Sequence, residues 1–404
     1  MTPLSLPAAI VAAKAFVALS GDRRWSARMA EIQDLAASGP RAGQAIRRRH
    51  AVELAIDRLR QPNRRLPGQA ELRLAAIAGK TAELANRLCP TGRGRLEAAL
   101  ADALRQDASL ISLFHLVRTA ALQESRGFDV RFSGLEEGTP FDLLLRKDRT
   151  EAELASDVVS AEDGRGVHRG AWFRLADRVD PDLQIWLAAH PGRYLLKMTL
   201  SNGLRLSDAA SGDAAPLAAL HRRINALLHA RVRHDHDEAI VLRLDPLLLA
   251  GSQSDETGLM SSLRREFGPE AHLSVTTAGG GVFVMAARAG QENEIAVSIR
   301  KRLAALAPAR LSGTRPGILS VFVEDTDRAE WRGLRERLEL EGETRQFLTN
   351  PEARTVVAVT FASRLELFGI QDADTAPDGE WRFRNPGHPA ARIAALAPAV
   401  LSSV

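Results

Sequence analysis

The spacing of apolar residues changes near Gly127. Over residues 7–126, leucine, alanine and isoleucine recur at intervals of three and four, which is the period of an α-helix, and glycine and proline interrupt the pattern at several points. We therefore predict a series of helices for this part of the chain. The last of them, residues 95–126, carries enough leucines for a stripe that faces a core, with one break allowed.

Three short segments of strand character follow Gly127. They are residues 128–132, 141–146 and 151–159, and they are separated by Gly138-Thr139-Pro140 and by Lys147-Asp148-Arg149. Turns this short predict an antiparallel meander, because parallel neighbours need a longer crossover.

Helices and strands continue to alternate towards the C-terminal end. A helix is predicted at residues 169–189 and a strand at residues 194–200. Further helices are predicted at residues 217–231, 259–267, 295–306 and 330–347, and further strands at residues 239–244, 317–324 and 355–361, with a hairpin at residues 273–287 that turns on three glycines. This mixture predicts an α/β fold.

The chain of 404 residues is long enough for two or three domains. We predict a basic helical domain at residues 1–96, a mixed α/β core at residues 97–205 and a C-terminal α/β region at residues 206–404. A second arrangement is open, in which the helix and strand within residues 295–324 close the sheet of the core and residues 205–290 are an insertion.

Basic charge is concentrated in the helical part. The net charge of the whole chain is +4, but the first 126 residues hold 20 Lys and Arg against 11 Asp and Glu, while the rest hold 34 against 39. Such a block can neutralise phosphates, and a solvated helical surface is the alternative. Arg47, Arg48 and Arg49 are the candidate nucleic-acid contacts in this region, again with a plain solvated helix face as the alternative.

The cysteine count and the distribution of apolar residues indicate the cellular compartment of the protein. The single cysteine, Cys89, rules out an internal disulfide framework and favours a reducing compartment. The apolar residues 4–20 include Lys14 and follow no basic segment, so they predict an amphipathic helix rather than a signal peptide. No stretch reaches the roughly eighteen apolar residues of a membrane span. We therefore expect a cytoplasmic protein without membrane contact.

Acidic residues gather on two of the three predicted strands. A turn centred on Asp148 and Arg149 places Asp142 opposite Ala155, with Glu153 and Asp157 as its diagonal neighbours on the same face. Diagonal neighbours lie about 7–8 Å apart, which lets their side chains share one ion. The alternative is a strand face that is simply solvated.

Residues 122–165 resemble the PD-(D/E)XK nuclease superfamily, and the resemblance extends over roughly residues 110–205. In that superfamily a helix leads into a strand meander with an Asp at the second strand and a Glu-x-Lys or Asp-x-Lys at the third. The resemblance implies a mixed sheet of the restriction-endonuclease-like type and hydrolysis of phosphodiesters with Mg²⁺ or Mn²⁺. It also implies Asp142 and Glu153 as metal ligands, with Glu124 and Asp157 in the catalytic set. Oxygen ligands suit such ions, which polarise the phosphate and activate water.

The lysine of the motif is absent under either alignment. If Glu153 is the glutamate of the motif, Ala155 stands at the lysine position. If instead the direct partner of Asp142 marks the motif, Ala155 replaces the glutamate and Asp157 replaces the lysine. Lys197, on the strand after the next predicted helix, is a candidate substitute from a neighbouring position.

Other polar residues are either functional or simply exposed to solvent. Glu124 lies about one turn before the first strand, where some members of the superfamily carry an acidic residue, and an exposed glutamate at a helix end is the alternative. Arg165, His168 and Arg169 are candidate phosphate contacts at a helix N-terminus, with a solvated loop as the alternative. Residues 233–238 have the composition of a metal-binding tract, but alternating histidines there favour plain surface.

Two functions remain in view. The first is a divalent-metal nuclease. The second is a pseudonuclease that keeps the fold to bind nucleic acid, in a role such as DNA repair or defence, or to bind a partner protein as a scaffold. The missing lysine favours the second function, with a nucleic acid as the expected partner.

Overall fold

The computed structural model describes residues 4–61, 66–106, 108–205, 215–247, 263–264, 267, 271–370, 374–376 and 378–403. The chain forms two compact units. The first comprises residues 1–34, 47–161 and 296–404, and the second comprises residues 35–46 and 162–295. This division differs from the predicted boundaries at residues 96 and 205, because the second unit is inserted between elements of the first.

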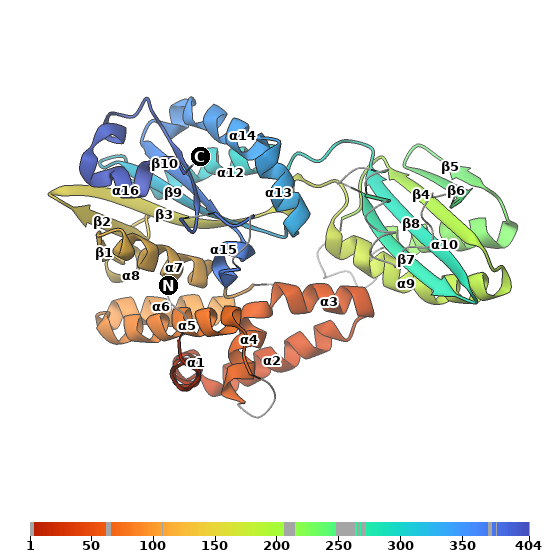
Figure 1. Ribbon diagram of the computed structural model, residues 1–404, viewed down its shortest axis with the longest axis horizontal. Helices are drawn as coiled ribbons and strands as arrows, with labels where there is room; N and C mark the ends of the chain where they lie inside the picture. Colours follow the sequence, from red (N-terminus) through yellow and green to blue (C-terminus); the bar gives the residue numbers. More distant parts are fainter. Residues whose placement is uncertain are drawn as a thin grey trace. The chain divides into compact units, whose positions relative to one another are not determined.

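The helical part of the first unit follows the predicted period. It contains α1 (Leu6–Ser20), α2 (Asp22–Ala36), α3 (Pro40–Arg49), α4 (Ala51–Arg60), α5 (Gln69–Arg87), α6 (Pro90–Ala103) and α7 (Ile111–Ser125), of which α3 lies mainly in the second unit. Proline occupies the first helical position of α6, where its missing N–H costs nothing. The break allowed within residues 95–126 falls between α6 and α7. Helix α5 packs between α1 and α7 (Figure 1).

A six-stranded mixed sheet forms the centre of the first unit. Its order is β1 (Asp129–Arg131), β2 (Leu143–Lys147), β3 (Thr150–Ser160), β9 (Gly317–Glu324), β10 (Val356–Ala362) and β11 (Trp381–Arg384). Strands β1, β2 and β3 form the predicted antiparallel meander, whereas β9 runs parallel to β3 and β10 runs parallel to β9. A short helix, α8 (Ser133–Glu136), joins β1 to β2.

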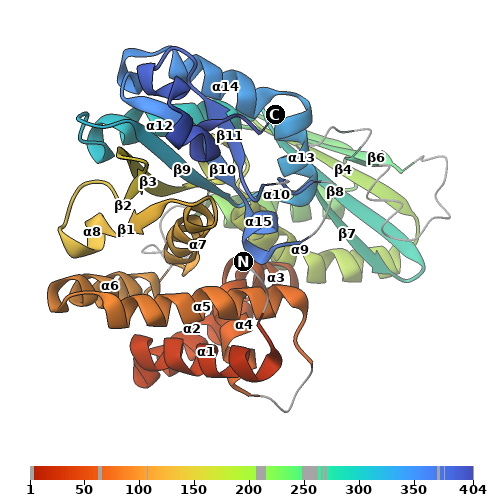
Figure 2. The same ribbon diagram turned by 60° about the vertical axis from the view of Figure 1, so that its left-hand side comes forward.

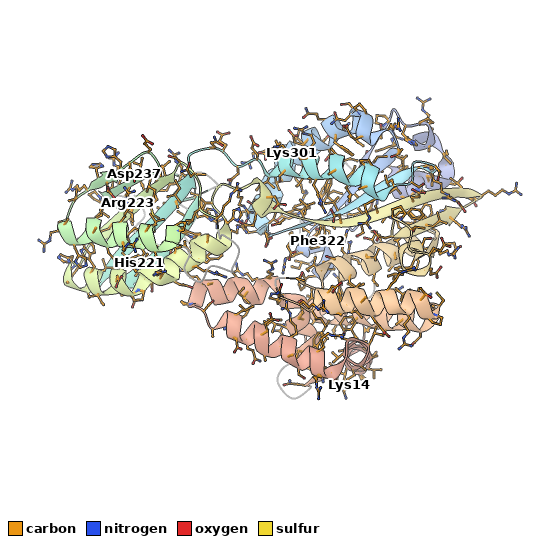
Figure 3. The ribbon with its side chains drawn as sticks, turned by 180° about the vertical axis from the view of Figure 1, so that it is seen from behind. Lys14, His221, Arg223, Asp237, Lys301 and Phe322 are labelled. Carbon is orange, nitrogen blue, oxygen red and sulfur yellow. The ribbon has the colours of Figure 1, made fainter. Side chains whose placement is uncertain are left out.

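Helices cover both faces of this sheet, which explains why every residue of β9 and β10 is buried. Helix α7 lies on one face, where the ring of His115 stands 5.5 Å from that of Phe322. Helix α12 (Ile295–Arg310) lies on the other face, together with α13 (Arg328–Glu336) and α14 (Glu339–Leu348), and Arg300 joins α12 to Glu343 of α14. Figure 2 shows these layers edge-on, and Figure 3 labels Phe322 in the sheet and Lys301 on α12. The short helices α15 (Arg364–Phe368) and α16 (Ala397–Val400) complete the unit.

The second unit is a five-stranded mixed sheet backed by helices α9 (Arg169–Ala189) and α10 (Ala215–Ala230). Its strands, in spatial order, are β5 (His234–His236), β6 (Ile240–Pro246), β4 (Arg193–Leu200), β8 (Gly281–Ala289) and β7 (His272–Ala278). The predicted hairpin on the three glycines joins β7 to β8. Residues 35–46 belong to this unit because Asp177 of α9 accepts hydrogen bonds from the Arg41 and Ala42 amides at the start of α3.

The protein is therefore an α/β protein with two mixed sheets. Strand β4 lies in the second sheet, so it does not close the meander of the first; β9 occupies that place, as in the second arrangement left open by the sequence. The helix predicted at residues 259–267 lies mostly outside the described residues. The same holds for residues 207–216, whose Ser, Asp, Ala and Gly content predicts a linker. No helix among the described residues combines the length and apolarity needed to cross a membrane.

The turn between β2 and β3 offers a test of backbone strain. Asp148 and Arg149 have φ of 46° and 66°, the left-handed pair of a two-residue hairpin turn, and glycine is the favoured second residue there. We expect Arg149→Gly to raise the free energy of unfolding by about 1 kcal/mol, measured by urea denaturation. Arg149→Ala, which keeps the strained φ, should stay within about 0.5 kcal/mol of the wild type. A glycine variant no more stable than the alanine variant would contradict the assignment of strain.

Candidate functional site

The candidate carboxylates share one face of the first sheet. Glu151 pairs with Arg146 and Glu153 with Leu144, which is the register that the sequence predicted, and one step further along Asp142 lies beside Ala155. Ser156 pairs with Ser320 of β9, whose side chain contacts α7. Since side chains alternate along a strand, the odd-numbered residues of β3 face away from α7 and towards α12.

Asp142 is held at the end of β2 by the backbone of β3. Its amide donates to the carbonyl oxygen of Leu154 at 3.0 Å, and its Oδ2 accepts from the Ser156 amide at 2.7 Å. Its carboxylate therefore has a fixed orientation on the face that carries Glu153 and Asp157.

Arginines from α12 and the segment that follows it contact each of these carboxylates. Arg310 Nη2 lies 2.8 and 2.9 Å from the two carboxylate oxygens of Asp142. Arg302 Nε lies 2.6 Å from Asp157 Oδ2. Arg315 spans two further groups, with Nε 2.7 Å from Glu151 and Nη1 3.4 Å from Glu153. The contacts of 2.6–2.9 Å are short charge-assisted hydrogen bonds, which are the strong ones in proteins.

Glu153 is the most deeply buried member of the group, with none of its surface exposed. Its Oε2 accepts from the Ser312 amide at 2.8 Å, and its Oε1 accepts from the Ser312 hydroxyl at 2.5 Å. Its own amide donates to the carbonyl oxygen of Pro316 at 2.9 Å. A buried carboxylate needs such partners, so Glu153 anchors the loop that leads from α12 into β9.

The electrostatic environment differs between the carboxylates. Burial raises the pKa of Asp142 above its ordinary value; Arg310 and the Ser156 amide oppose this shift, and the charge of Asp157 adds to it. The hydrogen bond from Arg315 instead lowers the pKa of Glu151, which is more exposed. Asp142 and Asp157 are therefore close enough for each charge to act on the other.

These carboxylates do not fit a divalent cation in the arrangement observed. Oxygen ligands of this kind suit Mg²⁺ or Mn²⁺, but the oxygens of Asp142 and Glu153 already accept hydrogen bonds from Arg310, Ser312 and Arg315. Across the described residues, no three His, Cys, Asp or Glu side chains converge as a metal-binding group. An ion at Asp142 and Glu153 would have to displace Arg310 and Ser312, which is costly because Ser312 holds the buried Glu153 and Arg310 holds the partly buried Asp142.

The structure separates Glu124 from the strand carboxylates. Its side chain pairs with Lys80 of α5 at 3.1 Å, on the side of α7 that faces away from the sheet. The sheet itself lies between α7 and the face that carries Asp142, Glu153 and Asp157. Glu124 is therefore the half-exposed glutamate near a helix end that was the alternative interpretation. Lys197 likewise lies on β4 of the second sheet, where it pairs with Asp245 at 3.3 Å.

Arg47, Arg48 and Arg49 lie at the C-terminal end of α3, and the first two are exposed. Arg364 of α15 donates to the carbonyl oxygens of Arg48 and Arg49, and it also pairs with Glu324 at 2.6 Å. Burial raises the pKa of Glu324, while the charges of Arg364 and Arg49 oppose this shift. Arg364 and Arg49 therefore oppose the burial of Glu324, whereas Arg47 and Arg48 are exposed at the end of α3.

Arg165, His168 and Arg169 do lie at a helix N-terminus, with His168 as the N-cap residue of α9. Glu162 occupies the position predicted for a phosphate, since its Oε2 accepts from the Arg169 amide at 2.9 Å and its Oε1 accepts from Arg165. Arg165 is 2% exposed. An acidic side chain of the protein itself therefore satisfies this helix end, and the three residues belong to the second unit.

Sequence reasoning missed the residues that neutralise the carboxylates, Arg302, Arg310, Ser312 and Arg315. They follow Asp142 by 160 residues or more. The second arrangement of the sheet, in which residues 295–324 close the core, contained the signal that could have found them. In that arrangement the basic helix at residues 295–306 precedes a strand beside β3, and it crosses the face that carries Asp157.

Comparison with family models, with curated proteins and with solved structures found no match to this chain.

Proposed function

We propose that this protein binds nucleic acid through a nuclease-like core, of the restriction-endonuclease-like type, that has lost cleavage. The single observation that carries the loss of cleavage is the set of arginines on the carboxylate face. Arg302, Arg310 and Arg315 provide there the positive charge that a metal ion provides in a divalent-metal nuclease.

One feature supports the nuclease-like core, and a second supports the loss of cleavage. Helix α7, the meander β1 to β3, helix α12 and strand β9 follow the order of helix, three strands, helix and strand, with the carboxylates on the second and third strands. The third strand has Ala155 at the lysine position of the motif under one alignment and Asp157 there under the other. In active members the lysine assists the attacking water, so its replacement also favours binding without cleavage.

Nucleic acid is the proposed partner because basic residues dominate the N-terminal helices and gather around Arg47, Arg48 and Arg364. Cations on a surface bind phosphodiesters by releasing the counterions of the phosphates, and such binding weakens as salt increases. Active cleavage is the second candidate, since three carboxylates share one face of the sheet.

Labelled single- and double-stranded DNA and RNA distinguish these candidates. We expect the wild type to shift the probes in a salt-dependent manner and to leave them uncut with Mg²⁺ or Mn²⁺. Cleavage that Asp142→Asn abolishes would establish the active nuclease and overturn the proposal. Cleavage that Asp142→Asn leaves unchanged would come from another site or from a contaminant. A protein that binds no probe even at low salt would favour the scaffold function.

The arginines themselves can be tested by charge removal. Arg302→Gln combined with Arg310→Gln leaves Asp142 and Asp157 without their cationic partners, so we expect this double variant to bind Mn²⁺ at least about tenfold more tightly than the wild type, as measured by calorimetry. Arg300→Gln combined with Arg345→Gln is the matched control, since it removes two arginines from α12 and α14 that pair with Glu343 and Glu341. Equal Mn²⁺ affinity in both double variants would show that the arginines do not take the place of a metal.

A further inference from the structure

The five-stranded sheet of the second unit has one face packed against helices, and part of its opposite face carries exposed basic side chains. Leu196, Met198 and Leu242 point into the core formed with α9 and α10. Side chains alternate along each strand, so Lys197, Thr199, Val241 and Arg243 point to the opposite face.

Strand pairing places these side chains in two adjacent rows on that opposite face. The first row runs from His234 through Arg243 to Lys197, and the second runs from His236 through Val241 and Thr199 to Arg288. The side chain of Arg243 is 57% exposed, that of Lys197 is 37% exposed and Val241 is 45% exposed. His234, His236 and Arg288 are also exposed.

We call Lys197, Arg243, Arg288, His234 and His236 the cationic face. Among the described residues, Asp245 is a carboxylate on this face, and it pairs with Arg243 at 2.8 Å and with Lys197 at 3.3 Å. Asp235 and Asp237 of this edge both pair with Arg223 of α10. Figure 3 labels Arg223 and Asp237. The register thus sends the cations to one side of the sheet and Asp235 to the other.

The remaining part of this side of the sheet is apolar. Leu195, Val284 and Ala286 form a small cluster there with Leu263, and Phe267 packs against it. The solvated part is therefore limited to β5, β6 and the C-terminal halves of β4 and β8, where the cations lie.

We propose that the cationic face binds the phosphodiester backbone of a nucleic acid. This inference rests on the proposed function and names a surface for it outside the nuclease-like core. Neighbouring strands bring cations to about 5 Å of each other and the two rows lie about 6.6 Å apart, so several phosphates of one strand can be contacted together. The two rows carry guanidinium, ammonium, hydroxyl and imidazole groups, which suit binding to phosphates without selection of base sequence. The Lys197 ammonium is partly exposed and lies 5.2 Å from the centre of the Phe267 ring.

Fluorescence anisotropy with fluorescein-labelled 30-nucleotide single-stranded and duplex DNA tests this inference in the full chain. The variant is Lys197→Gln with Arg243→Gln and Arg288→Gln. We expect it to bind about tenfold or more weakly than the wild type at low salt, with a shallower dependence of affinity on salt concentration, because fewer phosphates are neutralised. Asp245→Asn removes the carboxylate that competes with phosphate, so we expect it to bind on the order of threefold more tightly. A misfolded protein cannot reproduce such a gain.

The matched control removes three exposed, ion-paired arginines from the first unit, Arg105, Arg337 and Arg345. If this triple variant weakens binding as much as the first, the effect is one of net charge and the inference is wrong. If the wild type binds DNA and the cationic-face variants bind equally well, the inference is wrong while the proposed function stands. If the wild type binds no probe, the proposed function fails and this inference fails with it.

Discussion

Replacing Glu153 with alanine is expected to lower the free energy of unfolding by about 3 kcal/mol. The carboxylate is fully buried and accepts hydrogen bonds from the amide and hydroxyl of Ser312 and from Arg315. Its removal leaves the amide and hydroxyl of Ser312 without their acceptor and Arg315 with Glu151 alone, and breaking a pair that involves a buried charge costs about 3–5 kcal/mol. Since Arg315 is partly exposed, we expect the lower end of that range. Urea denaturation measures the change.

Glu151 is the matched control for this prediction. It lies two residues earlier on the same face of β3 and also pairs with Arg315, but its side chain is 31% exposed. Exposed ion pairs contribute about 0–1 kcal/mol, so Glu151→Ala should have a correspondingly small effect. If both substitutions lower the free energy of unfolding equally, Glu153 does not anchor the loop between α12 and β9. A functional role for Glu153 would then be favoured over a structural one.

Stability should also fall steeply in acid because of His115. Burial against the sheet, with a smaller effect from Arg118, lowers the pKa of this histidine to about 3 from 6.5. The unfolded chain binds a proton near pH 6.5 whereas the folded protein does not until about pH 3, so the free energy of unfolding decreases as the pH falls through this window. A shift of this size corresponds to about 4 kcal/mol between pH 7 and pH 3.

Denaturation with urea at several pH values checks this expectation. His115→Leu should unfold more easily at pH 7, since the hydrogen bond to the carbonyl oxygen of Ser320 is lost, but its stability should decline less between pH 7 and pH 4. His234→Leu, which removes an exposed histidine, should keep the pH dependence of the wild type. A His115→Leu variant with the wild-type pH dependence would show that another group causes the acid sensitivity, with His272 of the second unit as the next candidate because its pKa is also lowered to about 3.

The two proposals assign different tasks to the two sheets. The first sheet carries carboxylates whose charge is neutralised by arginines of the same chain, whereas the second sheet presents cations to solvent. If both proposals hold, affinity for nucleic acid comes from cationic surfaces, and the carboxylate face acts as a structural centre that joins α12 to β3. The predictions for Glu153 and for the cationic face test these tasks separately.

Local sequence was enough to predict the meander and its register. The two-residue turn at Asp148 and Arg149 fixes which residues of β2 and β3 lie opposite each other, and alternation then fixes the face of Glu153 and Asp157. The arrangement of β4 and β9 could not be predicted in this way. Parallel neighbours are joined by long crossovers, and nothing in the strand sequences indicates which of two later strands lies beside β3.

The sequence by itself determined the helical period up to residue 126, the strands of the meander and the common face of Asp142, Glu153 and Asp157, because these depend on neighbours in the chain. Only the tertiary structure decided what those carboxylates contact. Arg302, Arg310 and Arg315 reach them from α12 and the loop beyond it, after a second unit of more than a hundred residues. The interaction depends on a crossover over the sheet, so the charges that neutralise the site are local in space and remote in sequence.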